Sequence, residues 1–226
     1  MVKTGLSQRD IDILLFINEF GKSYSEIIHK CFFSNTSEQV CKNRLTVLKT
    51  KYNLIKHTAT DAISPRYYIS LTEAGKRYIY EELGVEYNPC FFSLSSLNHN
   101  FYEQLVFFAL KKAGKEPMRT KVIKWSKEHN HTPDIAYYNG EKLVYVEIEI
   151  SRKSTEVYNK IFNNIIKDGV SNIIYLAKDE KWKDRFLTIL PKFDGLRVAD
   201  IDTFFDIATK EGKIVADKQE NREIEK

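Results

Sequence analysis

Apolar residues in the first 84 positions recur mostly at the three-to-four-residue spacing of helices. Ser7 is the expected N-cap of a first helix that ends at Gly21, and further helices are expected over 24–31 and about 38–51. Thr72 is the expected N-cap of a fourth helix. The expected inward residues are Ile11, Leu14, Leu15, Ile17 and Phe20 in the first helix, Ile27 and Ile28 in the second, Val40, Leu45 and Leu48 in the third, and Tyr78, Ile79 and Leu83 in the fourth.

Between the third and fourth helices, two runs of β-favouring residues predict a hairpin. The first run begins at Leu54, turn-forming residues fill 58–65, and the chain returns over 66–69. The order of three helices, a hairpin and a fourth helix resembles a winged helix-turn-helix domain. The segment LTEAGKRYI after the hairpin is similar to the end of the wing in many bacterial regulators of that fold. The resemblance implies a DNA-binding domain over 1–88, with protein contacts alone as the alternative.

The rest of the chain alternates between strand and helix patterns. Pro89 and several serines break the helical periodicity, so a linker is expected over 89–96. Alternating elements then favour an α/β domain over 97–209, followed by a charged tail over 210–226. The expected elements are a helix over 97–112, a strand over 121–125, a hairpin over 135–150, a helix over 155–167, a strand over 172–177, a helix over 181–190 and a strand over 196–201.

Composition narrows the class of protein without identifying a partner. The chain is 42% hydrophobic and 29% charged, which fits one or two domains with real cores, and its net charge of +4 is too small to argue for nucleic acid by itself. Cys31, Cys41 and Cys90 are odd in number and form no CxxC pair, so neither a disulfide framework nor a zinc site is indicated. No stretch approaches the roughly 18 apolar residues of a membrane span, and a cytoplasmic protein without membrane contact is expected.

The positions of the basic residues are more informative than their total. The third helix carries four basic residues and a single acid, Glu38. The basic residues are Lys42, Arg44, Lys49 and Lys51. These four, with Arg66 in the hairpin, are the expected DNA contacts of the first domain. A second basic cluster over 111–127, which includes Lys121 and Lys124, is expected to hold phosphate backbone, with an ordinary solvated surface as the alternative.

Three carboxylates are predicted to converge on the hairpin. Side chains alternate along a strand, so Tyr145, Glu147 and Glu149 share one face. A two-residue turn at Asn139-Gly140 would set Asp134 opposite Tyr145, on the face of Glu147 and diagonal to it. Crowded carboxylates repel one another unless a cation neutralises them, and oxygen ligands suit Mg²⁺ or Mn²⁺. The alternative is the solvated face of an edge hairpin.

This pattern resembles the PD-(D/E)xK nuclease superfamily. Pro133-Asp134 matches the PD, and Glu147-Ile148-Glu149 matches the (D/E)xK except that Glu149 replaces the usual lysine. The resemblance implies a restriction-endonuclease-like mixed sheet, a catalytic metal, and a cation near the third position. Candidates for that cation are Lys153 and Lys160, and Glu103 matches the acid that such enzymes often carry on their first core helix. The expected metal ligands are Asp134, Glu147, Glu149 and Glu103.

Two histidines lie beside these acids in sequence. His99 and His131 are candidates for proton transfer or for holding the scissile phosphate, and each is otherwise an ordinary surface or hydrogen-bonded histidine. Nothing in the spacing of Tyr102, Tyr145 or Tyr158 singles out a covalent nucleophile.

The order of the motifs is similar to that of a known family. LNHNFYEQ, then TPD, then VEIEISRKS and a helix with Lys160, all after a winged helix, resemble the replication-relaxation family of plasmids and mobile elements, which overlaps the MobC-type relaxases. The resemblance implies a metal-dependent nickase or relaxase-like protein at an origin of replication or transfer, with double-stranded or supercoiled DNA as its partner. The alternatives are an inactive DNA-binding regulator and an accessory protein that recruits replication or conjugation proteins. A homodimer stays open.

Overall fold

The chain folds into two compact units, Met1–Leu97 and Asn98–Lys226. The computed structural model describes residues 5–60, 67–88, 97–120, 125, 129–212 and 214. Both helices and β-sheets are present, so the protein belongs to the mixed α and β class. The predicted linker over 89–96, together with Arg66, Lys121, Lys124 and most of the predicted tail, lies outside the described residues.

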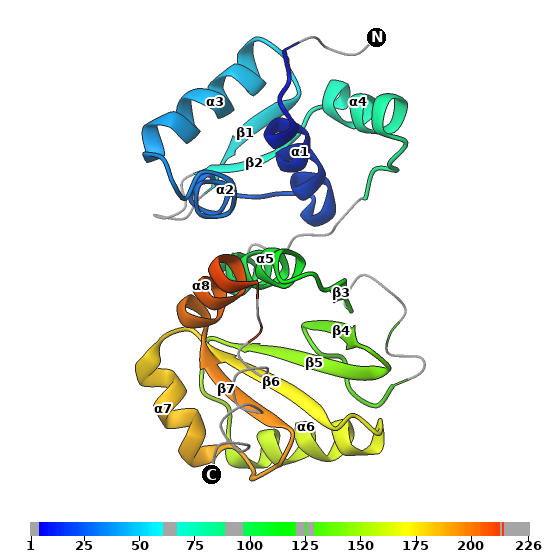
Figure 1. Ribbon diagram of the computed structural model, residues 1–226, viewed down its shortest axis with the longest axis vertical. Coiled ribbons are helices and arrows are strands. Elements are labelled where there is room, and N and C mark those ends of the chain that lie inside the picture. The colour runs from blue at the N-terminus through cyan, green and yellow to red at the C-terminus, as the bar shows by residue number, and fades with distance from the viewer. Residues whose placement is uncertain are drawn as a thin grey trace. The chain divides into compact units, whose positions relative to one another are not determined.

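The first unit has three helices, a β-hairpin and a fourth helix, as the hydrophobic pattern predicts (Figure 1). The elements are α1 (Gln8–Phe20), α2 (Ser25–Phe32), α3 (Glu38–Thr50), β1 (Ile55–Ala59), β2 (Tyr67–Leu71) and α4 (Glu73–Leu83). Ser7 caps α1 through a capping box with Asp10, and the Thr72 side chain accepts a hydrogen bond from the Gly75 N–H at the start of α4. Strands β1 and β2 pair antiparallel, with Ile55 opposite Leu71.

The core of the first unit lies between α1, α3, the hairpin and α4. Ile13, Leu14 and Ile17 of α1 pack with Leu45 and Leu48 of α3 and with apolar residues of the hairpin. The prediction of Val40 as an inward residue is wrong, because its side chain is 46% exposed. The four-then-three spacing of Cys41, Leu45 and Leu48 keeps those residues on one helix face, and Val40 lies about 100° away from Cys41.

The second unit is a five-stranded mixed sheet with helices on both faces (Figure 1). Its elements are α5 (Leu97–Lys112), β3 (Met118–Arg119), β4 (Ile135–Asn139), β5 (Lys142–Glu149), α6 (Thr155–Lys167), β6 (Asn172–Ala177), α7 (Glu180–Ile189), β7 (Leu196–Asp200) and α8 (Ile201–Glu211). The strands follow their sequence order across the sheet. Pairing is antiparallel from β3 to β5 and parallel from β5 to β7.

The two layers of helices cover opposite faces of this sheet. Helices α5 and α8 lie on one face, where the rings of Phe108 and Phe205 stack at 6.2 Å, and α6 and α7 lie on the other (Figure 1). On the α6 face, Tyr158 and Phe162 pack against Tyr175 of β6. Strand β5 is therefore covered on both sides in the middle of the sheet.

Two elements of the second unit differ from the prediction. Helix α8 occupies residues for which no element was expected, and its buried Ile201, Phe204, Phe205 and Ala208 form a helical stripe. The strand predicted over 121–125 lies mostly outside the described residues, and β3 ends earlier, at Arg119.

The turn of the β4–β5 hairpin is one residue later than predicted. Asn139 pairs with Lys142, so the two-residue loop is Gly140-Glu141. Gly140 has a φ of 60°, and a positive φ at the first loop residue favours glycine there. The Asn-Gly pair is therefore not the loop itself, and every cross-strand partner moves by two residues.

Candidate active site

The corrected register brings Asp134 close to Glu147. The ladder ends where Ile135 pairs with Val146, and Asp134 and Glu147 are the next residues outward on the two chains. The predicted placement of Asp134 opposite Tyr145 is wrong, because Ala136 is the partner of Tyr145. Asp134 is held here by the Ile148 N–H, which donates to its Oδ2 at 2.8 Å, and the Thr120 hydroxyl donates to the carbonyl of Pro133. Both carboxylates are thus fixed at the end of one strand pair.

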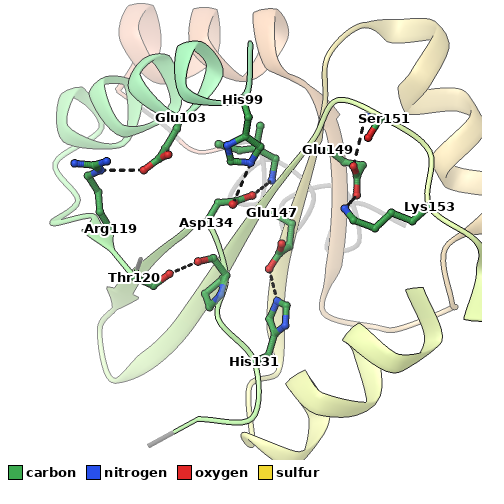
Figure 2. A network of polar contacts seen from close by, with 12 residues as sticks. His99, Glu103, Arg119, Thr120, His131, Asp134, Glu147, Glu149, Ser151 and Lys153 are labelled. Carbon is green, nitrogen blue, oxygen red and sulfur yellow. Dashed lines mark hydrogen bonds and ion pairs between the residues drawn. The ribbon is translucent and has the colours of Figure 1, made fainter. Parts of the chain in front are cut away.

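Each of these two acids contacts one of the predicted histidines (Figure 2). His99 from α5 places its Nε2 3.1 Å from Asp134 Oδ1. His131, just before β4, places its Nε2 2.6 Å from Glu147 Oε1. All four side chains are mostly buried. The structure therefore brings both histidines into the acidic site.

Glu149 lies two residues further along β5 and has its own cation. Its side chain is 4% exposed, and the Lys153 ammonium donates to its Oε2. The Ser151 N–H lies 3.4 Å from the other oxygen (Figure 2). Because β5 is the central strand, the alternative of a solvated edge hairpin does not describe these acids. Of the two predicted lysines, Lys153 reaches the site, whereas Lys160 is exposed on α6 and makes none of the described ion pairs.

Glu103 is buried on α5 but is bound to another partner. Arg119 of β3 donates from Nε to Glu103 Oε1 at 2.9 Å, and only 9% of the Arg119 side chain is exposed (Figure 2). The structure does not bring Glu103 into contact with Asp134 within the described residues. It also places Arg119, part of the second predicted basic cluster, inside the domain rather than on a phosphate-binding surface.

The electrostatics of the site favour an added positive charge. Burial raises the pKa of Glu147 to about 7, and the Asp134 charge adds to that shift, while His131 and Lys153 oppose it. Within the described residues, Arg119 and Lys153 are the permanent cations paired with Glu103 and Glu149, whereas Asp134 and Glu147 pair with histidines, which are charged only when protonated.

The donor set fits a hard divalent cation in chemistry. The candidate ligands are carboxylate oxygens, which Mg²⁺ and Mn²⁺ prefer. In the described parts of the chain, no three His, Cys, Asp or Glu side chains meet at one point as a ready ligand group. Each acid instead contacts a histidine through one carboxylate oxygen, so a cation at Asp134 and Glu147 would use the lone pairs that these contacts leave.

The predicted DNA contacts of α3 differ in their surroundings. Arg44 binds Asp10, which is fully buried, and also donates to the Gly5 carbonyl at 3.2 Å, so it has a structural role in the first unit. Lys42 pairs with Glu38 at 3.1 Å on the surface. Lys49 and Lys51 are exposed. Between these lysines the exposed face of α3 carries Gln39, Asn43 and Thr46.

One residue beside the site was not found from the sequence. Asp168 follows α6 and binds the backbone of Asn130 and His131, which lie more than 35 residues earlier. No motif or spacing marks this aspartate, because its partners are brought to it only by the packing of α6 on the sheet.

Comparison with known protein families and with curated proteins gives no match for this chain. Across the described residues, none of the helices combines the length and apolar character that crossing a bilayer requires.

Proposed function

We propose that the protein is a metal-dependent DNA endonuclease of the nickase or relaxase-like type, acting at an origin of replication or transfer of a plasmid or mobile element. The observation that carries the proposal is the pair of mostly buried carboxylates, Asp134 and Glu147, which follow the last pair of the β4–β5 ladder. Buried acids in this arrangement are costly without a cation, and functional sites are where such costs are commonly found.

The fold of each unit supports this proposal. Three helices followed by a hairpin and α4 are consistent with a winged helix, in which α3 would enter the major groove. A mixed sheet with helices on both faces, and with acids at one end of its antiparallel pair, is consistent with a PD-(D/E)xK nuclease. The order of motifs resembles that of the replication-relaxation family, which supports a joint role of the two units in acting on DNA at an origin.

The residues of the site have separate roles in the proposed reaction. Asp134 and Glu147 would hold Mg²⁺ or Mn²⁺, which when bound acidifies a water and offsets charge on the attacked phosphate. Lys153 brings a permanent positive charge to Glu149, at the position where the superfamily motif has lysine. His131 and His99 are placed to accept or hold a proton beside the two ligands.

A second candidate function is a DNA-binding regulator or accessory protein that does not cut. The observation in its favour is that every acid of the site is already paired with a base of the chain: Asp134 with His99, Glu147 with His131, Glu149 with Lys153 and Glu103 with Arg119. Such a site is electrostatically balanced once its histidines are protonated. It would bind DNA equally well when the acids are neutralised.

The deciding experiment is a nicking assay on supercoiled plasmid that carries the element's own origin region, with Mn²⁺ or Mg²⁺. The parent is compared with the isosteric variants Asp134→Asn and Glu147→Gln, and with Asp194→Asn, an exposed aspartate of the same unit, as the matched control. DNA binding is measured in parallel by gel mobility shift. We expect open circles from the parent and the control alone, with all four proteins binding. Binding by all four without nicking by any would favour the regulator.

A further inference from the structure

The carboxylate of Asp168 accepts four hydrogen bonds from residues far away in sequence. Its Oδ1 accepts from the Asn130 N–H at 2.6 Å and from the Asn130 side-chain amide at 2.7 Å. Its Oδ2 accepts from the His131 N–H at 3.0 Å and from the Tyr145 hydroxyl at 3.3 Å. Burial alone would raise the pKa of Asp168, but the bonds from Asn130 and His131 outweigh it and hold the pKa below its ordinary value. Asp168 is therefore ionised, and we call it, with the Asn130, His131 and Tyr145 groups that it binds, the clamp.

The position of Asp168 at the end of α6 does not explain why this residue is an aspartate. It is the C-cap of α6, and its backbone N–H completes the helix by donating to the carbonyl of Asn164. A negative charge at a helix C-terminus is unfavourable, because the helix dipole is negative there. Lys167 is the basic residue of this last turn, as the dipole favours. The carboxylate at 168 is thus explained by the segment that it binds rather than by α6.

The bound segment leads directly into the candidate site. With its N–H held by Asp168, His131 directs Nε2 at Glu147 Oε1 at 2.6 Å. Where Glu147 is ionised, its carboxylate only accepts hydrogen bonds, and Nε2 then carries the proton of this contact. Tyr145 stands two residues before Glu147 on β5, and its ring centroid lies 6.1 Å from that of His131. Asp168 therefore ties the segment to the strand that carries Glu147.

We propose that Asp168 is a positioning residue of the site, which fixes the Asn130–His131 backbone so that His131 holds the Glu147 carboxylate in one orientation. A histidine that donates to a ligating carboxylate orients the ligand, and loss of such support weakens metal binding. The cation part of this inference rests on the proposed function, whereas the orientation of His131 does not. The two parts are therefore measured separately.

The first readout is the side-chain ¹⁵N spectrum of the full chain without metal. The chain has five histidines, and the His131→Gln spectrum assigns the signal of His131. In the parent, at a pH where Glu147 is ionised, we expect the shifts of a ring with its proton on Nε2. Asp168→Asn places an amide donor against backbone N–H groups, so the shifts should move towards those of free imidazole. Asn130→Ala, which removes one of the four bonds, should move them less.

The second readout is the Kd for Mn²⁺, measured by calorimetry on the parent and the same variants. We expect Asp168→Asn to weaken binding about 10-fold, at the lower end of the effect of lost outer-shell support. The matched control is Ile165→Val, a buried residue of the same helix that takes no part in the clamp through its side chain. It should lower the unfolding temperature and leave both the His131 shifts and the Kd unchanged.

The outcomes separate the two proposals. His131 shifts that stay at the parent values in folded Asp168→Asn, while its unfolding temperature falls, would make Asp168 a purely structural staple and overturn the inference. If Asp168→Asn does not fold, the comparison of Asn130→Ala with Ile165→Val decides in the same way. A parent that binds no Mn²⁺ would overturn the proposed function alone, because the His131 shifts still report whether Asp168 positions the ring.

Discussion

At the scale of single residues, Glu147 is the side chain whose ionisation matters most. Its folded-state pKa of about 7 exceeds the ordinary value of 4.5, so the folded protein keeps this proton more tightly than the unfolded chain does. The resulting stability is fully present below about pH 4.5 and is lost as the pH rises to about 7. Above that pH the protein bears the whole cost of a buried charge.

The variant Glu147→Gln should therefore be more stable than the parent at neutral and higher pH. We expect a gain of roughly 2 kcal/mol in the free energy of unfolding above pH 7, reduced by the altered bond to His131. The gain should shrink as the pH falls and disappear below about pH 4.5. The measurement is urea unfolding at several pH values by tryptophan fluorescence, because both tryptophans, Trp125 and Trp182, are in the second unit.

An equal or lower stability of Glu147→Gln at pH 8 would contradict this account of the site. Saturating Mn²⁺ gives a further check, because a cation that binds the folded parent raises its stability. The cation should stabilise the parent more than the variant, which lacks one charged ligand.

At the scale of secondary-structure elements, Gly75 is a glycine that the packing requires. It lies in the first turn of α4, where a Cβ atom would overlap the backbone carbonyl of Leu54. The same region is joined by the Thr72 N–H, which donates to the Leu54 carbonyl at 3.0 Å. Helix α4 therefore approaches the start of the hairpin too closely for any side chain.

Replacing this glycine separates helix propensity from packing. Alanine at position 75 favours the helix by about 1 kcal/mol, yet we expect Gly75→Ala to lower the stability of the first unit by about 1–3 kcal/mol because backbone must move. Hydrogen exchange of peptides from α4 and the hairpin measures the effect. Glu81→Ala, at an exposed position of the same helix, is the control and should leave exchange unchanged. Equal protection in both variants would contradict the close approach.

The sequence predicted the elements better than it predicted their exact pairing. Capping residues such as Ser7 and Thr72 act locally, and their helices begin where expected. The turn of the hairpin was misplaced by one residue because Asn-Gly fits a different two-residue loop from Gly140-Glu141. Helix α8 has a helical stripe in its sequence, but no element was expected after the strand predicted over 196–201.

The candidate site was predicted in its acids and only partly in their partners. Strand alternation and the Pro133-Asp134 pair were enough to predict that Asp134 and Glu147 belong to one site (Figure 2). Lys153 and Lys160 were both candidates to reach back, and Lys153 is the one that pairs with Glu149. Glu103 with Arg119, Arg44 with Asp10, and the clamp at Asp168 depend on contacts between distant segments. No local pattern specifies those contacts.

At the scale of the whole molecule, the two units divide the proposed task. The first unit offers the exposed face of α3, with Lys49 beside polar side chains, and the second unit holds the acids. Affinity for DNA should then depend on α3, whereas cleavage should depend on β4 and β5. Variants in the first unit should leave metal binding by the second unit unchanged, and variants in the acids of the second unit should leave DNA affinity unchanged.

This division makes a prediction for Lys49. If Lys49 contacts a phosphate, Lys49→Gln should weaken binding of the origin DNA and reduce the slope of log affinity against log salt by about 1. Mn²⁺ stabilisation of the second unit, followed by tryptophan fluorescence, should be unchanged. Lys160→Gln, an exposed lysine of the second unit, is the matched control. An unaltered salt slope in Lys49→Gln would contradict a phosphate contact.

The hairpin of β4 and β5 also bears on how the second unit folds. Its strands are joined by two residues, so Asp134 and Glu147 can meet within microseconds, before the slower parallel pairing of β5 with β6 across α6. The two acids therefore come together early in folding, before α6 brings Asp168 to the His131 backbone and before His99 of α5 reaches Asp134.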